Sequence, residues 1–246
     1  MTYSGGKNGA GIFQRIINQM PPHSTYIEAF LGSGAVLRRK AMAERNIGID
    51  PSNKAHSLCL AEWPHAHLDL NLFEGSALDL LPTLETLVSK ARLIDQPDTL
   101  IYADPPYVME TRKGGDLYDF ELTDDDHIRL LEILTSARCM VMISGYRSGL
   151  YDEALAGWRR IDYMANTRQG MAAESLWLNF PEPSALHDYR YLGDDYRQRE
   201  RIKRKRERWA GKFAKMDRLE RLAVMSALTE VAGPVSASVP AKNDDV

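Results

Sequence analysis

The stretch "IYADPPYV" places a carboxylate, two prolines and a tyrosine directly behind an apolar run. Prolines fix the backbone φ angle and have no N–H, but their carbonyl oxygens remain hydrogen-bond acceptors. A carboxylate beside such a carbonyl offers two acceptors with no donor between them, which suits an exocyclic –NH2 group that has two hydrogens to donate. Accepting both hydrogens exposes the nitrogen lone pair, and the tyrosine adds a flat face on which a base can stack. The catalytic candidates for chemistry at an amino nitrogen are therefore Asp104, Pro105, Pro106 and Tyr107.

The stretch "FLGSGAV" contains a second candidate site. Gly32 and Gly34 let the backbone approach a ligand closely, and Asp50, at the end of the next predicted strand, can accept hydrogen bonds from ribose hydroxyls. A dinucleotide-binding oxidoreductase would show a similar arrangement, but Leu37 stands where the third glycine of its Gly-x-Gly-x-x-Gly motif belongs. A tight turn without a ligand explains the glycine pair equally well. For Asp-Pro-Pro-Tyr the alternative is a turn that only ends the strand.

Alternating strand and helix patterns position both candidate sites. Apolar and β-branched runs predict strands at 25–30, 46–50 and 138–145 and a hairpin of two strands at 159–168 and 173–180. They also predict a strand, a turn and a helix start over 68–81, and a strand with a prolyl stop over 98–107. Amphipathic runs predict helices at 12–20, 36–45, 52–63 and 123–137, the last capped by Thr123 with Asp126 three residues on. This order predicts an open, mostly parallel α/β sheet, in which ligand sites lie at the carboxyl ends of the strands.

Composition excludes several classes of protein. The 246 residues are 44% hydrophobic and 26% charged, which is typical of a soluble globular chain, and no apolar run reaches the roughly 18 residues of a membrane span. The N-terminus lacks the pattern of a signal peptide, and both cysteines stand in apolar runs. We therefore expect a cytoplasmic protein with no disulfide framework, no metal site and no membrane partner.

The charge is distributed unevenly along the chain. Residues 197–218 hold 11 Lys or Arg and 3 Asp or Glu, so that this segment carries +8 and the rest of the chain −11. The segment reads as one or two helices, and we expect a polyanionic partner there. Trp209, Phe213 and Met216 recur at helical spacing and predict packing against the body or a partner helix. The expected organisation is a body over 1–183, a basic helical extension over 184–232 and a disordered tail over 233–246.

Four motifs together resemble one family. In the order "YSGGK", "IEAFLGSGAV", "GID" and "ADPPY", the chain resembles the Dam-like (D12 class) DNA N6-adenine methyltransferases over about residues 3–180. The Asp-Pro-Pro-Tyr motif is specific for amino-group methyltransferases, and its combination with Gly-Gly-Lys points to this class. The resemblance implies a Rossmann-like fold that binds S-adenosylmethionine, carries a C-terminal antiparallel hairpin, and flips the target adenine out of DNA.

The resemblance also assigns roles to residues. It implies that Asp104 and Pro105 take the hydrogens of the adenine amino group and that Tyr107 stacks on the flipped base. It implies a cofactor site formed by Tyr3, Lys7, Phe30, Gly32, Gly34, Asp50 and Asp104. The stretch "SGY" at 144–146 is expected to line the site, and Glu174 and Trp177 are expected to be structural.

Two departures from the family concern the turn and DNA recognition. The turn reads Glu28-Ala29-Phe30 where the family usually has Glu-Pro-Phe, and the interval from Asp50 to Asp104 leaves no room for the family's target-recognition domain. The recognised sequence is therefore left open. Candidate nucleic-acid contacts, each with a solvated surface as the alternative, are Arg112, Lys113, Lys203, Arg204, Lys205 and Arg206.

The leading hypothesis is thus methyl transfer to adenine N6 in DNA. An RNA substrate is a close rival, because the missing domain weakens the case for duplex DNA. A nucleic-acid-binding protein without catalysis is a third reading, and a dinucleotide oxidoreductase is the most distant one. The sequence leaves the oligomeric state open.

Overall fold

The computed structural model describes residues 7, 9, 11–63, 70–86, 90–111, 120–167 and 170–232. The helices are α1 (Ile12–Ile17), α2 (Asn53–Ala61), α3 (Ala77–Leu80), α4 (Asp124–Ser136), α5 (Gly149–Ala154), α6 (Tyr196–Ala214) and α7 (Arg218–Ala232). The strands are β1 (Thr25–Ala29), β2 (Arg45–Asp50), β3 (Leu70–Glu74), β4 (Thr99–Ala103), β5 (Met140–Gly145), β6 (Arg159–Thr167) and β7 (Gly170–Leu178).

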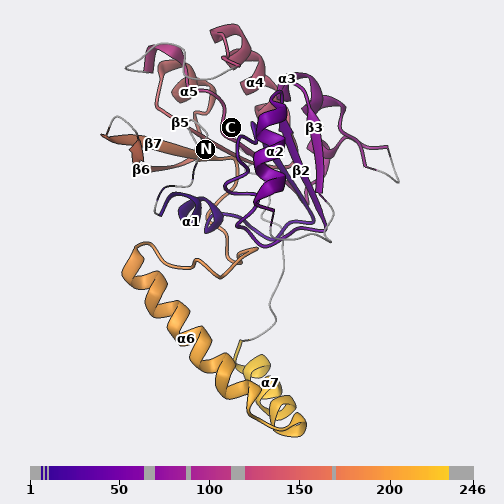
Figure 1. The fold of residues 1–246 in the computed structure, drawn as a ribbon, viewed down its shortest axis with the longest axis vertical. Coiled ribbons are helices and arrows are strands. Elements are labelled where there is room, and N and C mark those ends of the chain that lie inside the picture. The colour runs from indigo at the N-terminus through magenta and orange to yellow at the C-terminus, as the bar shows by residue number, and fades with distance from the viewer. Residues whose placement is uncertain are drawn as a thin grey trace.

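The seven strands form one sheet in the order β3-β2-β1-β4-β5-β7-β6 (Figure 1). The pairs from β3 through β5 are parallel, whereas β7 runs antiparallel to β5 and pairs with β6 as a hairpin. The expected α/β class with a late antiparallel hairpin is therefore confirmed. From β1 the chain builds outward to β3 and then returns to β4 on the other side of β1, and ligands of such sheets bind where the strand order reverses.

The core lies on both faces of the central strands. Strand residues alternate between the faces, so that Ile27 and Ile101 pack with α3 and α4 on one face. Tyr26 and Leu100 pack with α1 on the other. All residues of β1, β4 and β5 are buried, which fits parallel strands covered by helices on both faces.

The helix start at Thr123 is confirmed, but the helix predicted over 36–45 is wrong. The Thr123 hydroxyl accepts from the Asp126 N–H, and the Asp126 carboxylate accepts from the Thr123 N–H. Residues 35–39 form turns instead of a helix. The reason is Lys40, which is fully buried and whose Nζ donates to the Ala41 carbonyl at 2.8 Å and to Asn46 Oδ1 at 3.2 Å. Folding around this buried amino group overrides the helical propensity of the segment.

A buried carboxyl in β1 makes stability depend on pH. Glu28 Oε2 accepts from the Tyr26 hydroxyl at 2.9 Å and from the Leu37 N–H at 2.7 Å, and burial raises its pKa from 4.5 to about 8. Between these two values the folded chain keeps a proton that the unfolded chain has released, so the free energy of unfolding falls as the pH rises from 4.5, and the contribution of this proton is gone above 8. Glu28→Gln does not titrate. We expect it to gain on the order of 3 kcal/mol over the wild type between pH 5 and pH 8 in denaturant unfolding. The exposed Glu44→Gln should show no such gain, and equal curves for Glu28→Gln and wild type would contradict this expectation.

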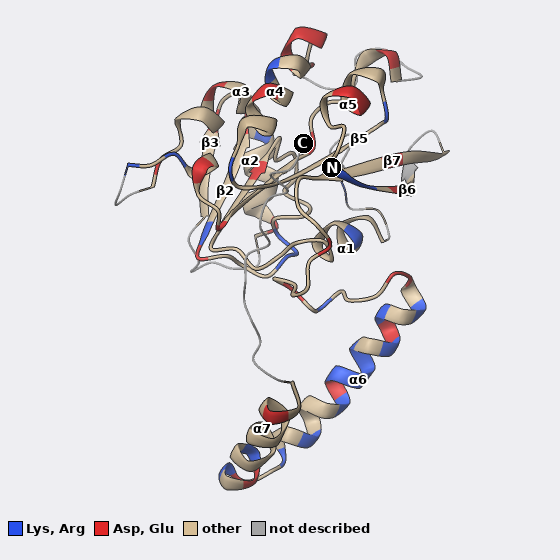
Figure 2. Ribbon diagram, turned by 180° about the vertical axis from the view of Figure 1, so that it is seen from behind, with Lys and Arg blue, Asp and Glu red and all other residues tan. Residues whose placement is uncertain are grey.

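The basic extension begins beside α1, and its helices run away from the sheet (Figure 1). No residue of α6 or α7 is buried, and most of the Lys and Arg residues of the extension lie on α6 (Figure 2). Trp209 is 54% exposed, so the stripe of Trp209, Phe213 and Met216 does not pack against the body, and packing against a partner helix stays a prediction. Phe213 and Met216 are half-buried near the turn into α7.

Within the described ranges, no helix combines the length and the hydropathy needed to cross a membrane.

Candidate active site

The carboxyl ends of β1, β2 and β4 bring the two predicted motifs to one edge of the sheet. In the parallel register Ala29 lies opposite Ile49 on one side and Ala103 on the other. The next residues along each strand, Phe30, Asp50 and Asp104, therefore emerge together. The Asp104 N–H also donates to the Ala29 carbonyl at 3.4 Å, which links the two loops directly.

The glycine turn is held in shape by Asp50. Its Oδ2 accepts from the Gly32 N–H at 2.8 Å and its Oδ1 from the Ser52 N–H at 2.9 Å, in a carboxylate that is only 4% exposed. Burial raises the pKa of Asp50, while these two hydrogen bonds act in the opposite direction. Phe30, Gly32 and Gly34 all have positive φ angles, 63°, 51° and 64°, so the turn is tight enough to need left-handed backbone.

Gly34 cannot accept a side chain without cost. A Cβ at this position would lie 2.7 Å from Cys59 Sγ, and φ is +64°. We expect Gly34→Ala to lower the free energy of unfolding by about 2–3 kcal/mol, because a strained backbone adds to a steric contact. Gly149→Ala is the matched control, since its Cβ would meet nothing within 4 Å. It should stay within about 0.5 kcal/mol of wild type in denaturant unfolding. Equal stabilities of the two variants would contradict this expectation.

Among the described residues, the side chains that hold Asp104 contact one of its two oxygens. Oδ1 accepts from Lys7 Nζ at 2.8 Å and from the Ser144 hydroxyl at 2.8 Å. The Ser144 hydroxyl in turn lies 2.8 Å from the hydroxyl of Tyr102. Burial raises the pKa of Asp104, and the positive charge of Lys7 opposes this rise. The side chain keeps 16% of its surface exposed, so the carboxylate is fixed in direction but is not sealed from solvent.

Lys7 is the centre of a buried polar cluster. Its Nζ lies 2.8 Å from Asp104 Oδ1 and 3.3 Å from Glu174 Oε2, and it donates to the Tyr107 hydroxyl at 2.5 Å. The Lys7 side chain is 5% exposed. Burial acts to lower the pKa of Lys7, but attraction to Asp104 and Glu174 outweighs it, and the pKa lies well above its ordinary value. The structure thus places Lys7 directly on the predicted catalytic carboxylate.

Glu174 is the residue that the sequence did not mark for this site. It comes from β7, its Oε2 contacts Lys7, and the same oxygen accepts from the Tyr163 hydroxyl of β6 at 3.0 Å. The side chain is buried. The one available signal was a lone carboxylate inside the apolar run "MAAESLWLNF", where an unpaired charge would be costly.

An aromatic ring in the loop after β4 lies against a second ring that follows β5. Pro105 and Pro106 are buried and Tyr107 is half-buried. The ring of Tyr107 lies 4.3 Å from that of Tyr146, with an interplanar angle of 55°. The stretch 144–146 therefore contributes both a hydroxyl to Asp104 and a ring to Tyr107, as expected for residues that line the site.

The remaining predicted residues are not part of this cluster. Tyr3, Arg112 and Lys113 lie outside the described residues. Lys203, Arg204, Lys205 and Arg206 lie on α6, away from the sheet (Figure 2). In the part of the chain that the structure describes, no group of three or more His, Cys, Asp or Glu residues is arranged to hold a metal ion.

Comparison with known proteins gives a fold likeness only. No family model and no curated protein matches the chain. One similar solved structure is an rRNA methylase from Streptococcus thermophilus, with 10% identity over 68% of this chain and 90% of that chain and a TM-score of 0.42. The N-methyltransferase NodS from Bradyrhizobium japonicum WM9 has 11% identity over 70% and 93% and a TM-score of 0.45. SMU.1697c from Streptococcus mutans, in complex with SAH, has 10% identity over 67% and 93% and a TM-score of 0.44. These values are too low to assign a substrate to this chain.

Proposed function

We propose that the chain transfers a methyl group from S-adenosylmethionine to the N6 nitrogen of adenine in DNA. The observation that carries the proposal is the way the Asp104 carboxylate is hydrogen-bonded at the end of β4. Lys7 and Ser144 both contact Oδ1. Oδ2 has no partner among the described residues, so it is the oxygen of this partly exposed carboxylate that can accept a hydrogen from an incoming amino group. Asp104 Oδ2 and the carbonyl oxygen of the next residue, Pro105, together form the pair of acceptors that an exocyclic –NH2 group requires.

Each residue of the site has a separate role in the proposed reaction. Asp104 Oδ2 and the Pro105 carbonyl accept the two amino hydrogens, which exposes the nitrogen lone pair. Lys7 keeps Asp104 ionised in spite of its burial. Adenine has to leave the base stack to reach this edge of the sheet. Tyr107 and Tyr146 then offer aromatic surface on which the flipped base can stack.

The glycine turn and Asp50 fit the proposed cofactor. When bound, S-adenosylmethionine supplies the electrophilic methyl group. The left-handed backbone at Gly32 and Gly34 keeps side chains out of the space next to the carboxyl edge of the sheet. Each Asp50 oxygen holds one backbone N–H and has a second lone pair that can accept a ribose hydroxyl.

An RNA substrate is favoured by one observation. The described elements between Asp50 and Asp104 are α2, β3, α3, two short 3-10 turns and β4, all of them part of the α/β body. No separate unit for reading duplex DNA stands among them. The same amino-group chemistry could therefore serve an adenine in RNA.

Incubation with methyl-labelled S-adenosylmethionine and sequence-matched duplex DNA, single-stranded DNA and RNA tests the proposal. We expect label in DNA adenine. Label in RNA alone would show that the substrate is RNA and not DNA. Binding of NAD without binding of S-adenosylmethionine would end the methyltransferase proposal and favour an oxidoreductase.

A further inference from the structure

The cations of α6 occupy two opposite faces of the helix. At 3.6 residues per turn, Arg199, Lys203 and Arg206 share one face. These three line a hollow together with Gly11 and Gln14 of the body and with Tyr191, which precedes α6 in the extension. Arg206 donates to the Tyr189 carbonyl at 3.0 Å, and Arg199 donates to the Gly193 carbonyl at 3.4 Å. The inner face therefore lies toward the body at Gly11 and Gln14, and its two hydrogen bonds go to the segment that precedes α6.

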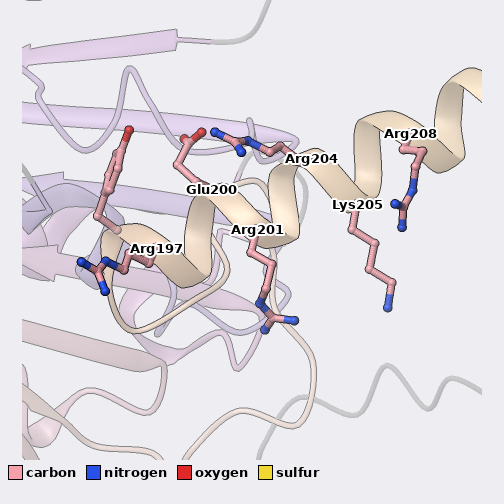
Figure 3. A pocket seen from close by; sticks show the side chains of 7 residues that line it. Arg197, Glu200, Arg201, Arg204, Lys205 and Arg208 are labelled. Atoms are coloured by element: carbon pink, nitrogen blue, oxygen red, sulfur yellow. The ribbon is translucent and has the colours of Figure 1, made fainter.

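The opposite face of α6 carries a row of cations. Arg197, Arg201, Lys205 and Arg208 follow one another at spacings of four, four and three residues, which places them on one stripe about 17 Å long. We call these four residues the outer stripe. All four are exposed. Figure 3 shows Arg201, Lys205 and Arg208 extending to the same side, whereas Arg204 extends toward Glu200 on the flank.

Cations outnumber acidic residues along the outer stripe, because the hollow there is lined by Arg197, Arg201, Arg204, Lys205 and Arg208 and by the acidic Glu200. The α6 sequence holds nine Lys or Arg and two Glu, and among the described residues none of its cations forms an ion pair. Like charges four residues apart, as in Arg197–Arg201 and Arg201–Lys205, destabilise a helix. No α6 residue is buried, so packing does not offset this repulsion. A polyanion laid along the stripe would remove it.

We propose that the outer stripe binds the phosphodiester backbone of the nucleic acid, and this partner rests on the function proposed above. Arginine forks suit phosphate oxygens, and a row of them supplies affinity without reading sequence. The stripe would thus hold the substrate near a body whose described elements include no separate recognition unit. Of the cations predicted from sequence, Lys205 belongs to the stripe, Arg204 lies on its flank, and Lys203 and Arg206 lie on the inner face.

A triple variant with a matched control tests the proposal. Arg201→Gln/Lys205→Gln/Arg208→Gln removes three stripe charges, and Lys90→Gln/Arg92→Gln/Arg138→Gln removes three from the exposed surface of the body. Affinity for a 30-base-pair DNA duplex is measured by fluorescence anisotropy over a series of NaCl concentrations. We expect the stripe variant to lose about tenfold or more in affinity at physiological salt. The slope of log K against log salt should become shallower by about 2–3, while the control matches wild type.

Two outcomes separate this proposal from the proposed function. If the stripe variant keeps the wild-type affinity and slope, the stripe is not the contact, even where the enzyme methylates DNA. If the stripe variant loses affinity and the wild type transfers no methyl group, the stripe proposal stands and the proposed reaction fails. Equal losses in the stripe variant and the control would also overturn the stripe, because they would show a general effect of net charge.

Discussion

Asp104→Asn is expected to reduce methyl transfer by about 10²–10³-fold, the scale found when one preorganised polar group is removed from a reacting centre. The amide keeps the shape of the side chain but presents a donor as well as an acceptor. An incoming –NH2 group then meets an N–H where it requires a lone pair. Lys7 also loses the negative partner that lies 2.8 Å from its Nζ. The measurement is initial-rate methyl transfer from labelled S-adenosylmethionine to duplex DNA.

The control for Asp104→Asn is Asp79→Asn, which replaces an exposed aspartate that pairs with Arg129. Asp79→Asn should keep wild-type rates. Affinity for S-adenosylmethionine, measured by calorimetry, should change little in either variant, because the ribose is assigned to Asp50. Near-full activity of Asp104→Asn would contradict the role of the carboxylate, and a parallel loss of cofactor affinity would place that role in binding.

Lys7→Met is expected to lower the free energy of unfolding by about 3–5 kcal/mol at pH 8, because it leaves Asp104 and Glu174 buried without a cation. The loss should depend on pH. Without Lys7, burial and Glu174 together raise the pKa of Asp104 further. The folded state then accepts a proton more readily than the unfolded state, which stabilises the variant at low pH and destabilises it as the pH rises.

Urea unfolding of Lys7→Met at pH 5 and pH 8 measures this dependence. We expect the difference from wild type to be larger at pH 8. Lys54→Met, which removes an exposed lysine at the start of α2, should match wild type at both values. A loss of equal size at both pH values would indicate that Lys7 contributes packing alone and does not hold Asp104 ionised.

Local chemistry allowed much of the site to be predicted from sequence. Asp-Pro-Pro-Tyr, the glycine turn and Asp50 each carry their signal within a few residues, and the parallel register brings them to one edge. The helix start at Thr123 was predicted for the same reason, because its capping box closes over three residues.

Long-range contacts could not be predicted in the same way. Lys7, Asp104 and Glu174 are far apart along the chain, and no spacing rule links β4 to the hairpin of β6 and β7. The missing helix over 36–45 has a similar origin, since the burial of Lys40 depends on Asn46 and the surrounding body. The two faces of α6 differ because only the inner face contacts Tyr189, and the α6 sequence by itself does not show which face makes that contact.

The central claim is that this chain methylates an exocyclic amino nitrogen of adenine. Its most direct test is nucleoside mass spectrometry of DNA from cells that express the wild type or Asp104→Asn at equal protein levels, in a host that lacks adenine methylation. We expect N6-methyladenine with the wild type and background levels with Asp104→Asn. Equal background levels with both proteins, or a methylated base other than adenine, would contradict it.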